Sequence, residues 1–441
     1  MTADLITKVA GAGLIRVASL EDILKLNKSL TNEEKAKKLR VKYILTHSFL
    51  IKDDGFDIWC KLENIESGVA LFSNKISEPM DMATQMVGKL ANDIITSLKI
   101  KTKQDVMKAP TINVEAYEYY LRAKNKFYKM QNKADSEIVK GLLHKAIKLD
   151  DNLLEAKDML GMYQNNDEAM ETYTQNLNQA ERMDDKNMMG RSLVSIGHVY
   201  WGRGDYEQAM EFLTRSFDIY EKLDDKDGIG SSLLMIGTVY LHSGNYDKAL
   251  EFLIQSLAVR KEIDKKTSMA VSLDMIGHCY RCKGIYDKAL AYYTDSFEIR
   301  EGLGQKIALD WSFRNLGLIY KDKGYYKKAL EYQEKSLNIR KDFADTTDVG
   351  FLENTANLYF LYNKLGKEYD EKEIHILIKG IENIEFDLNY TLYQLLEDTS
   401  FLETAYNQIQ ELADNLEPDV ASKFLSYPIP RAIVEEWEKF N

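Results

Sequence analysis

The chain has 441 residues, enough for roughly two to four domains and a sizeable core. With 58 Lys and Arg against 70 Asp and Glu, its formal net charge of −12 argues against nucleic acid or an anionic membrane surface as the main partner. Hydrophobic residues make up 45% of the chain, which excludes an intrinsically disordered protein.

The sequence predicts neither export nor membrane insertion. Its apolar runs are far shorter than the ~20 residues needed to cross a bilayer. Asp4 comes early, and Lys8 and Arg16 enclose only a short apolar stretch, which makes a poor signal peptide. Three cysteines cannot build a disulfide framework, so we expect a cytoplasmic protein.

Residues 1–99 are expected to form a small α/β domain. Its first elements are predicted to be helices over residues 2–9 and 20–26, with a short strand over 14–18 between them. The sequence Thr31-Asn32-Glu33-Glu34 has the pattern of a capping box, which opens a further helix.

A three-stranded meander is the clearest piece of this domain. Apolar and polar residues alternate over 41–77, and the Asp-Gly at 54–55 and Ser-Gly at 67–68 are suited to tight turns. Pro79 is expected to begin a last helix, because its fixed φ suits the first helical position. The polar stretch 100–112 is interpreted as a linker.

The longest part of the chain is a repeat without helix breakers. No proline occurs in the 307 residues from Thr111 to Glu417, which excludes a proline-punctuated β fold there. Four segments within this stretch align without gaps at a period of 40 residues. The recurring residues are Gly197, Gly237, Gly277 and Gly317; Tyr200, Tyr240, Tyr280 and Tyr320; Gly204, Gly244, Gly284 and Gly324; Tyr206, Tyr246, Tyr286 and Tyr326; and Ala209, Ala249, Ala289 and Ala329.

Each unit predicts a helical hairpin. Apolar stripes at helical spacing precede and follow the G-x-Y of every unit. Gly204 is placed to end the first helix, and the small Gly197 and Ala209 let two helices approach. Tyr200 and Tyr206 supply the bulk that fills the joint. One hairpin cannot bury its own apolar faces, so neighbouring hairpins must stack.

The L/I-G-x-x-Y…G-x-Y-x-x-A pattern of each unit resembles the tetratricopeptide repeat. The unit has 40 residues instead of the roughly 34 of the common form, and it lacks the usual proline after the second helix. The resemblance implies a mainly α fold, a right-handed solenoid whose concave groove binds peptides or partner domains. The four regular units occupy residues 190–345.

Divergent units are expected on both sides of the regular ones. Residues 113–189 are predicted to hold two such units, the second with a degenerate first helix. Residues 346–441 are predicted to hold one more unit, with Gly366 out of phase, and a helical cap broken at Pro428-Ile429-Pro430. A cap is expected because an open-ended solenoid exposes its last apolar face.

The first 99 residues carry a second resemblance. The segments L-x-V-x-Y-I-L-x-x-S-F and E-S-G-x-x-L-F-S are similar to the TolB-type (FlgO-like) amino-terminal domain, which accompanies class III nucleotide cyclase domains in bacterial regulators. The resemblance implies that the chain begins inside that domain, after its first strand. It carries over no catalytic residue, because this chain has no cyclase domain.

Motifs for catalysis or metal binding are weak. Cys279 and Cys282 form a C-x-x-C within a repeat helix, whereas redox pairs lie at a helix N-terminus that lowers the thiol pKa. No second cysteine pair completes a zinc site, so Cys279 is interpreted as a core residue. The six histidines are scattered, and no phosphate-binding glycine loop occurs. We therefore expect no enzyme, cofactor or metal.

The remaining candidate site is the face of the first helices, here called the partner groove. Positions −6, −3, +1 and +4 from each repeat glycine share one side of the helix. Trp beside Arg and His is typical of binding hot spots. The alternative is that some of these side chains pack against neighbouring helices or the cap. The partner groove comprises Arg191, Val194, His198, Trp201, Leu234, Thr238, Leu241, Asp274, His278, Arg281, Trp311, Arg314, Leu318 and Lys321.

The later half of the partner groove is basic within an acidic array. Arg281, Arg314 and Lys321 lie there, whereas the chain after residue 110 carries a net charge of −15, interpreted as solvated helix faces. Such a groove favours an acidic peptide or a chain-terminal carboxylate.

The leading hypothesis is therefore a non-enzymatic regulatory scaffold that binds a protein or peptide. The alternative is the sensor and scaffold tail of a nucleotide cyclase-type signalling protein whose catalytic domain lies outside this chain.

Overall fold

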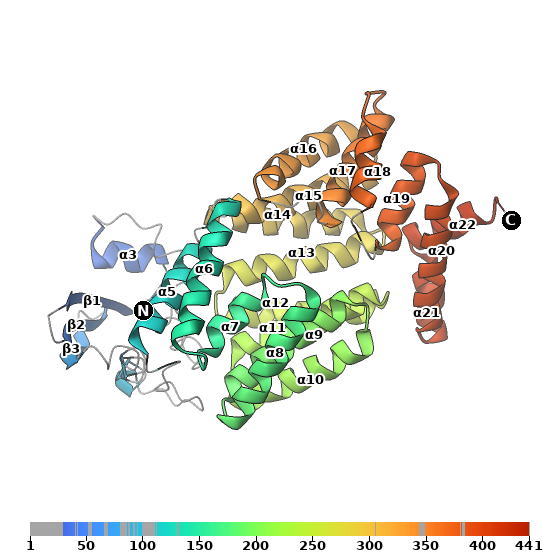
Figure 1. Cartoon of the computed structure of the whole chain (residues 1–441). Helices are drawn as coiled ribbons and strands as arrows, with labels where there is room; N and C mark the ends of the chain where they lie inside the picture. Colours follow the sequence, from blue (N-terminus) through green and yellow to red (C-terminus); the bar gives the residue numbers. More distant parts are fainter. Residues whose placement is uncertain are drawn as a thin grey trace. The chain divides into compact units, whose positions relative to one another are not determined.

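The computed structural model describes residues 30–39, 41, 43–51, 55–65, 69–79, 111, 113–128, 130, 132–304, 306–343, 349–379, 381 and 384–440, with isolated positions between 86 and 98. The described chain is mainly helical and contains one small sheet (Figure 1). It divides into two compact units. The first unit comprises Met1–Met130, Ala134–Met235 and Ala258–Lys266. The second comprises Gln131–Lys133, Ile236–Leu257 and Thr267–Asn441.

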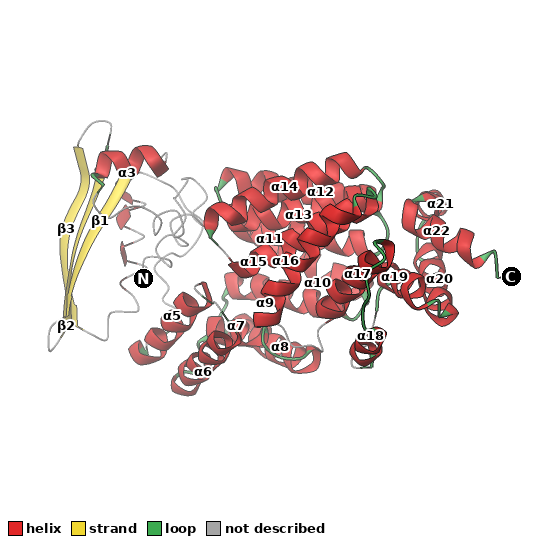
Figure 2. Ribbon diagram, turned by 90° about the horizontal axis from the view of Figure 1, so that it is seen from above, coloured by secondary structure: helices red, strands yellow, loops and turns green. Residues whose placement is uncertain are grey.

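The N-terminal part confirms the capping box and the meander. The amide of Glu34 donates to Thr31 Oγ1 at 3.2 Å, and the amide of Thr31 donates to Glu34 Oε2 at 2.8 Å. The three strands pair antiparallel in chain order (Figure 2). The elements are α3 (Asn32–Leu39), β1 (Tyr43–Ile51), β2 (Gly55–Asn64) and β3 (Val69–Pro79).

The prediction that Pro79 begins a helix was wrong. Pro79 is the last residue of β3, where it lies opposite Gly55. β3 is an edge strand, which tolerates a residue without an N–H group, so proline fits this position as well as a helix start. The elements expected over residues 2–9, 14–18 and 20–26, and most of the linker, lie outside the described residues.

Helical hairpins follow from residue 114 onward. In the first unit they are α5 (Val114–Tyr128), α6 (Lys133–Leu149), α7 (Leu154–Gly161), α8 (Asn166–Arg182), α9 (Lys186–Gly202) and α10 (Tyr206–Leu223). The next three helices have residues in both units: α11 (Lys226–His242), α12 (Tyr246–Glu262) and α13 (Lys266–Cys282). The expected degenerate helix is α7, which has only 8 residues.

The second unit continues the hairpins and ends in the expected helical tail. Its repeat helices are α14 (Tyr286–Leu303), α15 (Lys306–Asp322), α16 (Tyr326–Phe343), α17 (Val349–Lys364) and α18 (Glu371–Ile378). The tail comprises α19 (Phe386–Leu396), α20 (Thr399–Asp414), α21 (Pro418–Ser426) and α22 (Pro428–Trp437). Pro428 begins α22, so the proline cluster separates two helices of the tail.

The turn glycines have the backbone that the repeat pattern predicts. Gly204, Gly244, Gly284 and Gly324 adopt φ of +78°, +84°, +75° and +77°, a region in which a Cβ is disfavoured. The amide of Gly204 donates to the carbonyl of Trp201 at 2.9 Å and ends α9. Each first helix therefore stops at its glycine.

The helix-contact glycines lie where two helices meet, as predicted. A Cβ on Gly197 would lie 2.7 Å from Cγ of Leu213, and one on Gly277 would lie 2.8 Å from the Tyr293 ring. Beside these contacts, one aromatic pair stacks within each hairpin. The pairs are Tyr200 with Phe212, Tyr240 with Phe252, Tyr280 with Tyr292 and Tyr320 with Tyr332, at centroid distances of 5.4–5.6 Å.

Gly277→Leu is expected to destabilise the protein by about 1–3 kcal/mol, since the new side chain would overlap the Tyr293 ring. Tyr293 is only 1% exposed and has no room to move aside. Urea unfolding compares this variant with Gly302→Ala, because a Cβ on Gly302 meets no atom within 4 Å. The control should gain about 0.5–1 kcal/mol from helix propensity. Equal midpoints for the two variants would contradict the packing described above.

Candidate functional site

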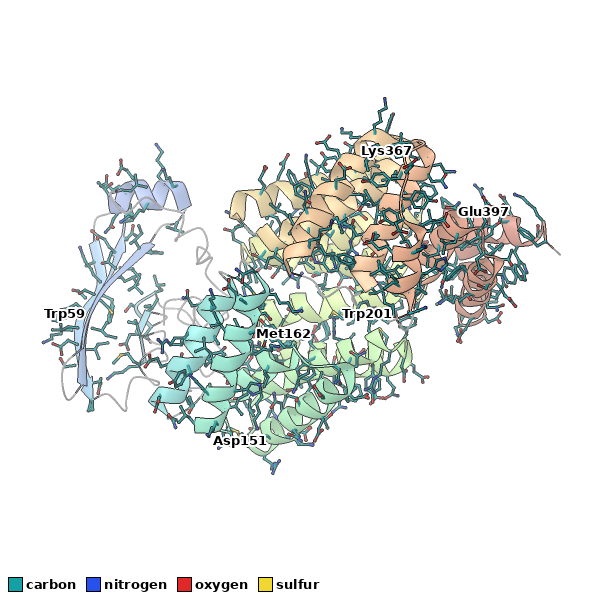
Figure 3. The ribbon with its side chains drawn as sticks, turned by 45° about the horizontal axis from the view of Figure 1, so that its top comes forward. Trp59, Asp151, Met162, Trp201, Lys367 and Glu397 are labelled. Carbon is teal, nitrogen blue, oxygen red and sulfur yellow. The ribbon has the colours of Figure 1, made fainter. Side chains whose placement is uncertain are left out.

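The first unit presents part of the partner groove on α9. Arg191 and His198 are exposed, and Val194 and Trp201 are half-buried. The Arg191 Nε donates to Oδ2 of Asp158 on α7 at 2.5 Å, which orients the guanidinium. The rings of His198 and Trp201 lie 5.2 Å apart between centroids (Figure 3 labels Trp201). The same helix thus presents the cation of Arg191 in its first half and the His198–Trp201 pair near its end. Leu234 of α11 is half-buried in the same unit.

In the second unit, most of the partner groove is buried. Thr238, Leu241, Asp274, Arg281, Arg314 and Leu318 are all less than 9% exposed, whereas Trp311 is 47% exposed. The tail helices contact this surface at several points. In the second unit, the groove side chains therefore pack against neighbouring helices or the cap, which was the alternative interpretation of the sequence.

The acidic start of α19 lies on the basic side chains of the second unit. Oε1 of Glu385 lies 3.0 Å from Nδ1 of His242, and a carboxylate oxygen of Asp387 lies 3.9 Å from Nη1 of Arg281. Burial opposes ionisation of Glu385, but the adjacent His242 holds the pKa of Glu385 at about 2. Burial lowers the pKa of His278 to about 3, and the Arg281 charge adds to this effect.

A second contact attaches α21 and α22 to the turns of the repeats. A Cβ on Gly244 would lie 2.8 Å from the Phe424 ring, and one on Gly284 would lie 2.7 Å from Cγ of Pro428. Phe424 also faces the Tyr246 ring at 6.1 Å. The tail therefore packs on two consecutive turn glycines, where a side chain would prevent the approach.

The prediction that the later half of the partner groove presents free positive charge was wrong, because its basic side chains have partners within the second unit. Arg281 Nε donates to Oδ2 of Asp322 at 2.6 Å. Arg314 forms an ion pair with Glu353 and lies over the Trp311 ring at 4.3 Å. The expectation failed because each basic side chain has a partner on a helix that follows it, and these partners do not recur with the period.

Lys321 and Asp274 also find partners inside the second unit. The ammonium of Lys321 donates to the amide oxygen of Asn357. Asp274 points away from the groove toward α14, where its carboxylate lies 2.6 Å from Nη2 of Arg300. The burial of this pair makes Asp274 a core residue.

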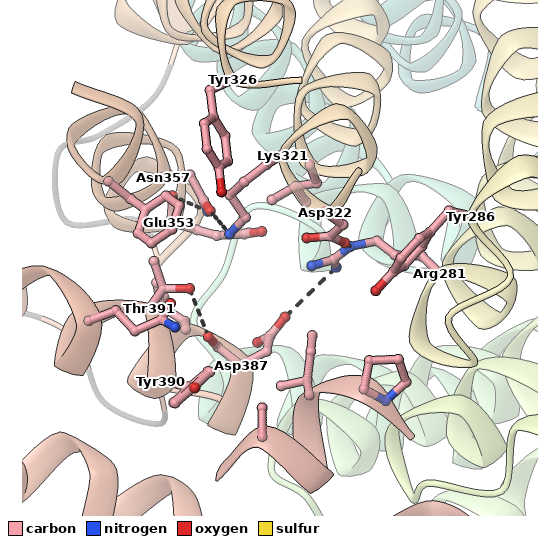
Figure 4. A pocket seen from close by; sticks show the side chains of 17 residues that line it. Arg281, Tyr286, Lys321, Asp322, Tyr326, Glu353, Asn357, Asp387, Tyr390 and Thr391 are labelled. Carbon is pink, nitrogen blue, oxygen red and sulfur yellow. Dashed lines mark hydrogen bonds and ion pairs between the residues drawn. The ribbon is translucent and has the colours of Figure 1, made fainter. Parts of the chain in front are cut away.

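A cavity remains between the repeats and the tail in the second unit. It has a volume of about 230 Å³ and is lined by residues of α13 to α17, α19 and α22, with Arg281, Lys321 and Asp387 on its walls (Figure 4). Sequence reasoning identified Arg281 and Lys321 as candidates but missed Asp387. The acidic residues near the start of the tail were the only available signal for it.

The thiols of the C-x-x-C pair lie in an environment that disfavours their ionisation. Cys279 is fully buried, and burial raises the pKa of its thiol well above the ordinary value. Burial likewise raises the pKa of Cys282 to about 12, which disfavours the reactive thiolate. Among the described residues, no group of three or more His, Cys, Asp or Glu could hold a metal ion, and no helix there is long and apolar enough to cross a membrane.

Family models match the repeats. Models described as "Tetratricopeptide repeat" match residues 190–225, 228–302 and 268–342. The repeat resemblance is thereby confirmed for these residues, while the TolB-type resemblance of residues 1–99 stays a prediction. No curated protein matches the sequence.

Solved structures of other proteins are similar to this chain. A Rap protein complexed with Competence and Sporulation Factor is 18% identical over 82% of this chain and 95% of its own, with a TM-score of 0.51. The apo form of RapI is 17% identical over 74% and 99%, with a TM-score of 0.40. BtubC from P. vanneervenii is 18% identical over 49% and 89%, also at 0.40. The first of these supports a tetratricopeptide-like solenoid fold for this chain.

Proposed function

We propose that this chain is a non-enzymatic regulatory scaffold that binds a protein or peptide on the first-helix face of its tetratricopeptide repeats. The observation that carries the proposal is the binding of the chain's own tail to that face in the second unit. Glu385 and Asp387 contact His242 and Arg281 there. A polypeptide segment with acidic side chains is thus the kind of ligand that these helices accommodate.

The part of the groove on α9 is the proposed contact for an external partner. Arg191 and His198 are exposed, and the Trp201 ring lies beside that of His198. Trp and Arg are among the residue types enriched in binding hot spots. Because Asp158 compensates only one guanidinium nitrogen of Arg191, the remaining donors suit an acidic side chain of the partner. The net charge of −12 supports a protein rather than a nucleic acid as partner, and a cytoplasmic location belongs to the same proposal.

Selection from a random peptide library on the full chain tests the proposal. The enriched peptides should carry Asp or Glu, and fluorescence anisotropy should show about 30-fold weaker binding to Trp201→Ala, the loss typical of a hot-spot residue. Arg191→Ala should remove the preference for acidic peptides. The matched control is Trp59→Ala, since Trp59 is an exposed tryptophan of β2 outside the repeats. Failure to enrich any peptide, or undiminished binding to both α9 variants, would refute the proposal.

A further inference from the structure

The cavity of the second unit has charged walls whose pairing is incomplete. Three of its five charged side chains are well compensated: Arg281 and Asp322 bind each other at 2.6 Å, and Glu353 forms an ion pair with Arg314. A charge removed from water costs several kcal/mol unless a counter-ion or hydrogen bonds replace the solvent. The other two charged side chains on the walls, Lys321 and Asp387, are the exceptions.

Lys321 has a neutral partner only. Its ammonium donates to the amide oxygen of Asn357 and lies 5.2 Å from the centre of the Phe360 ring. Within the described part of the chain, Lys321 forms no ion pair. An ammonium has three donors, so two of them are left to face the cavity. Burial accordingly lowers the pKa of Lys321.

Asp387 is the corresponding anion on the opposite helix. Its closest cation is Nη1 of Arg281 at 3.9 Å, and that guanidinium already binds Asp322 more tightly. Burial raises the pKa of Asp387 to about 6, and the nearby Glu385 adds to this effect. Lys321 on α15 and Asp387 on α19 therefore line one cavity without reaching each other (Figure 4).

We propose that this cavity binds a free α-amino acid, whose carboxylate contacts Lys321 and whose ammonium contacts Asp387. The cavity offers one cation and one anion with spare capacity, and a zwitterion satisfies both at once. A ligand with a single charge would leave the other wall uncompensated.

The size and the apolar walls define the ligand further. About 230 Å³ is below the roughly 300–1,000 Å³ typical of sites for drug-sized ligands, so the ligand is small. Apolar surface of the cavity comes from Leu318, Phe360, Leu388 and Ile429. We therefore expect an amino acid with an apolar side chain, such as leucine. Because such a ligand would bridge the repeats and the tail, it should also raise the melting temperature of the full chain.

Isothermal titration of the full chain with each standard amino acid tests the proposal. At least one apolar amino acid should bind with Kd below about 1 mM. For leucine, two analogues separate the charges: 4-methylpentanoate lacks the ammonium, and isoamylamine lacks the carboxylate. Each analogue should bind at least about tenfold more weakly than leucine, because it leaves one buried charge unpaired. If another amino acid binds best, its own analogues without the ammonium and without the carboxylate are used instead.

Variants of Lys321 and Asp387 test whether these two residues bind the amino acid. Lys321→Met and the isosteric Asp387→Asn should each weaken binding by at least about tenfold. Lys323→Met is the matched control, because Lys323 lies just after α15 and pairs with Asp287 outside the cavity. Circular dichroism verifies that each variant is folded, and Asp387→Asn decides the outcome if Lys321→Met unfolds.

Three results would overturn the proposal. The first is that no amino acid binds, which would mean that the cavity holds water alone. The second is that 4-methylpentanoate binds as tightly as leucine. The third is that Lys323→Met weakens binding as much as Lys321→Met. Peptide binding on α9 uses other residues, so failure here leaves the proposed scaffold function open to its own test.

Discussion

An Asp310→Ala variant is expected to lose about 3–5 kcal/mol of unfolding free energy, the usual cost of leaving one partner of a buried ion pair unpaired. Asp310 of α15 and Arg340 of α16 lie 2.6 Å apart, with side chains 8% and 7% exposed. The second carboxylate oxygen of Asp310 accepts the hydroxyl of Ser336 at 2.5 Å. Removing the carboxylate would therefore take an ion-pair partner from the buried Arg340 guanidinium and an acceptor from the buried Ser336 hydroxyl.

Urea unfolding followed by circular dichroism measures the loss. The double variant Asp310→Ala with Arg340→Met should recover a large part of it, because an apolar side chain replaces the buried guanidinium charge. Glu331→Ala provides a control from the same hairpin, since Glu331 pairs with Lys335 on the exposed surface. If the Asp310 and Glu331 variants unfold at the same urea concentration, the Asp310 pair contributes nothing to stability.

The buried ion pair of Asp310 with Arg340 could be predicted from the repeat only in part. Arg300 and Arg340 occupy equivalent positions 40 residues apart, yet Arg300 binds Asp274 and Arg340 binds Asp310. These two acids do not share a repeat position, because they lie one helical turn apart within the unit. Periodicity thus predicts the backbone and the glycine contacts, while ion pairs inside the core depend on individual substitutions.

The tail shows a second limit of sequence reasoning. The basic character of the later groove was visible in Arg281, Arg314 and Lys321, but their partners were not. Glu385 lies 143 residues after His242, and no local pattern links the two. Capping and turn residues predict where a helix begins and ends. Contacts between residues that are more than a hundred positions apart depend on tertiary packing alone. The same limit explains why Asp387 was missed as a wall of the cavity.

Replacing Phe424 by Ala is expected to cost about 3–5 kcal/mol, the range for a fully buried phenylalanine. The side chain is 0% exposed and lies between the Tyr246 ring and the Phe386 ring, each 6.1 Å away between centroids. It also covers Gly244, where the repeat ends a helix. Because Phe424 joins α21 to both α12 and α19, its loss should loosen the tail before the repeats unfold.

Hydrogen exchange locates that loosening. Amides of α19, α21 and α22 should exchange faster in Phe424→Ala, while those of α9 and α10 keep their protection, because local opening is confined to the helices that lose the contact. Phe440→Ala is the matched control, since this phenylalanine is 56% exposed, and its effect on stability should stay within about 0.5 kcal/mol. Uniformly faster exchange along the whole chain would show that the tail and the repeats unfold as one. Unchanged exchange in the tail would mean that Phe424 does not anchor it, and the acidic contacts of Glu385 and Asp387 would then have to hold the tail by themselves.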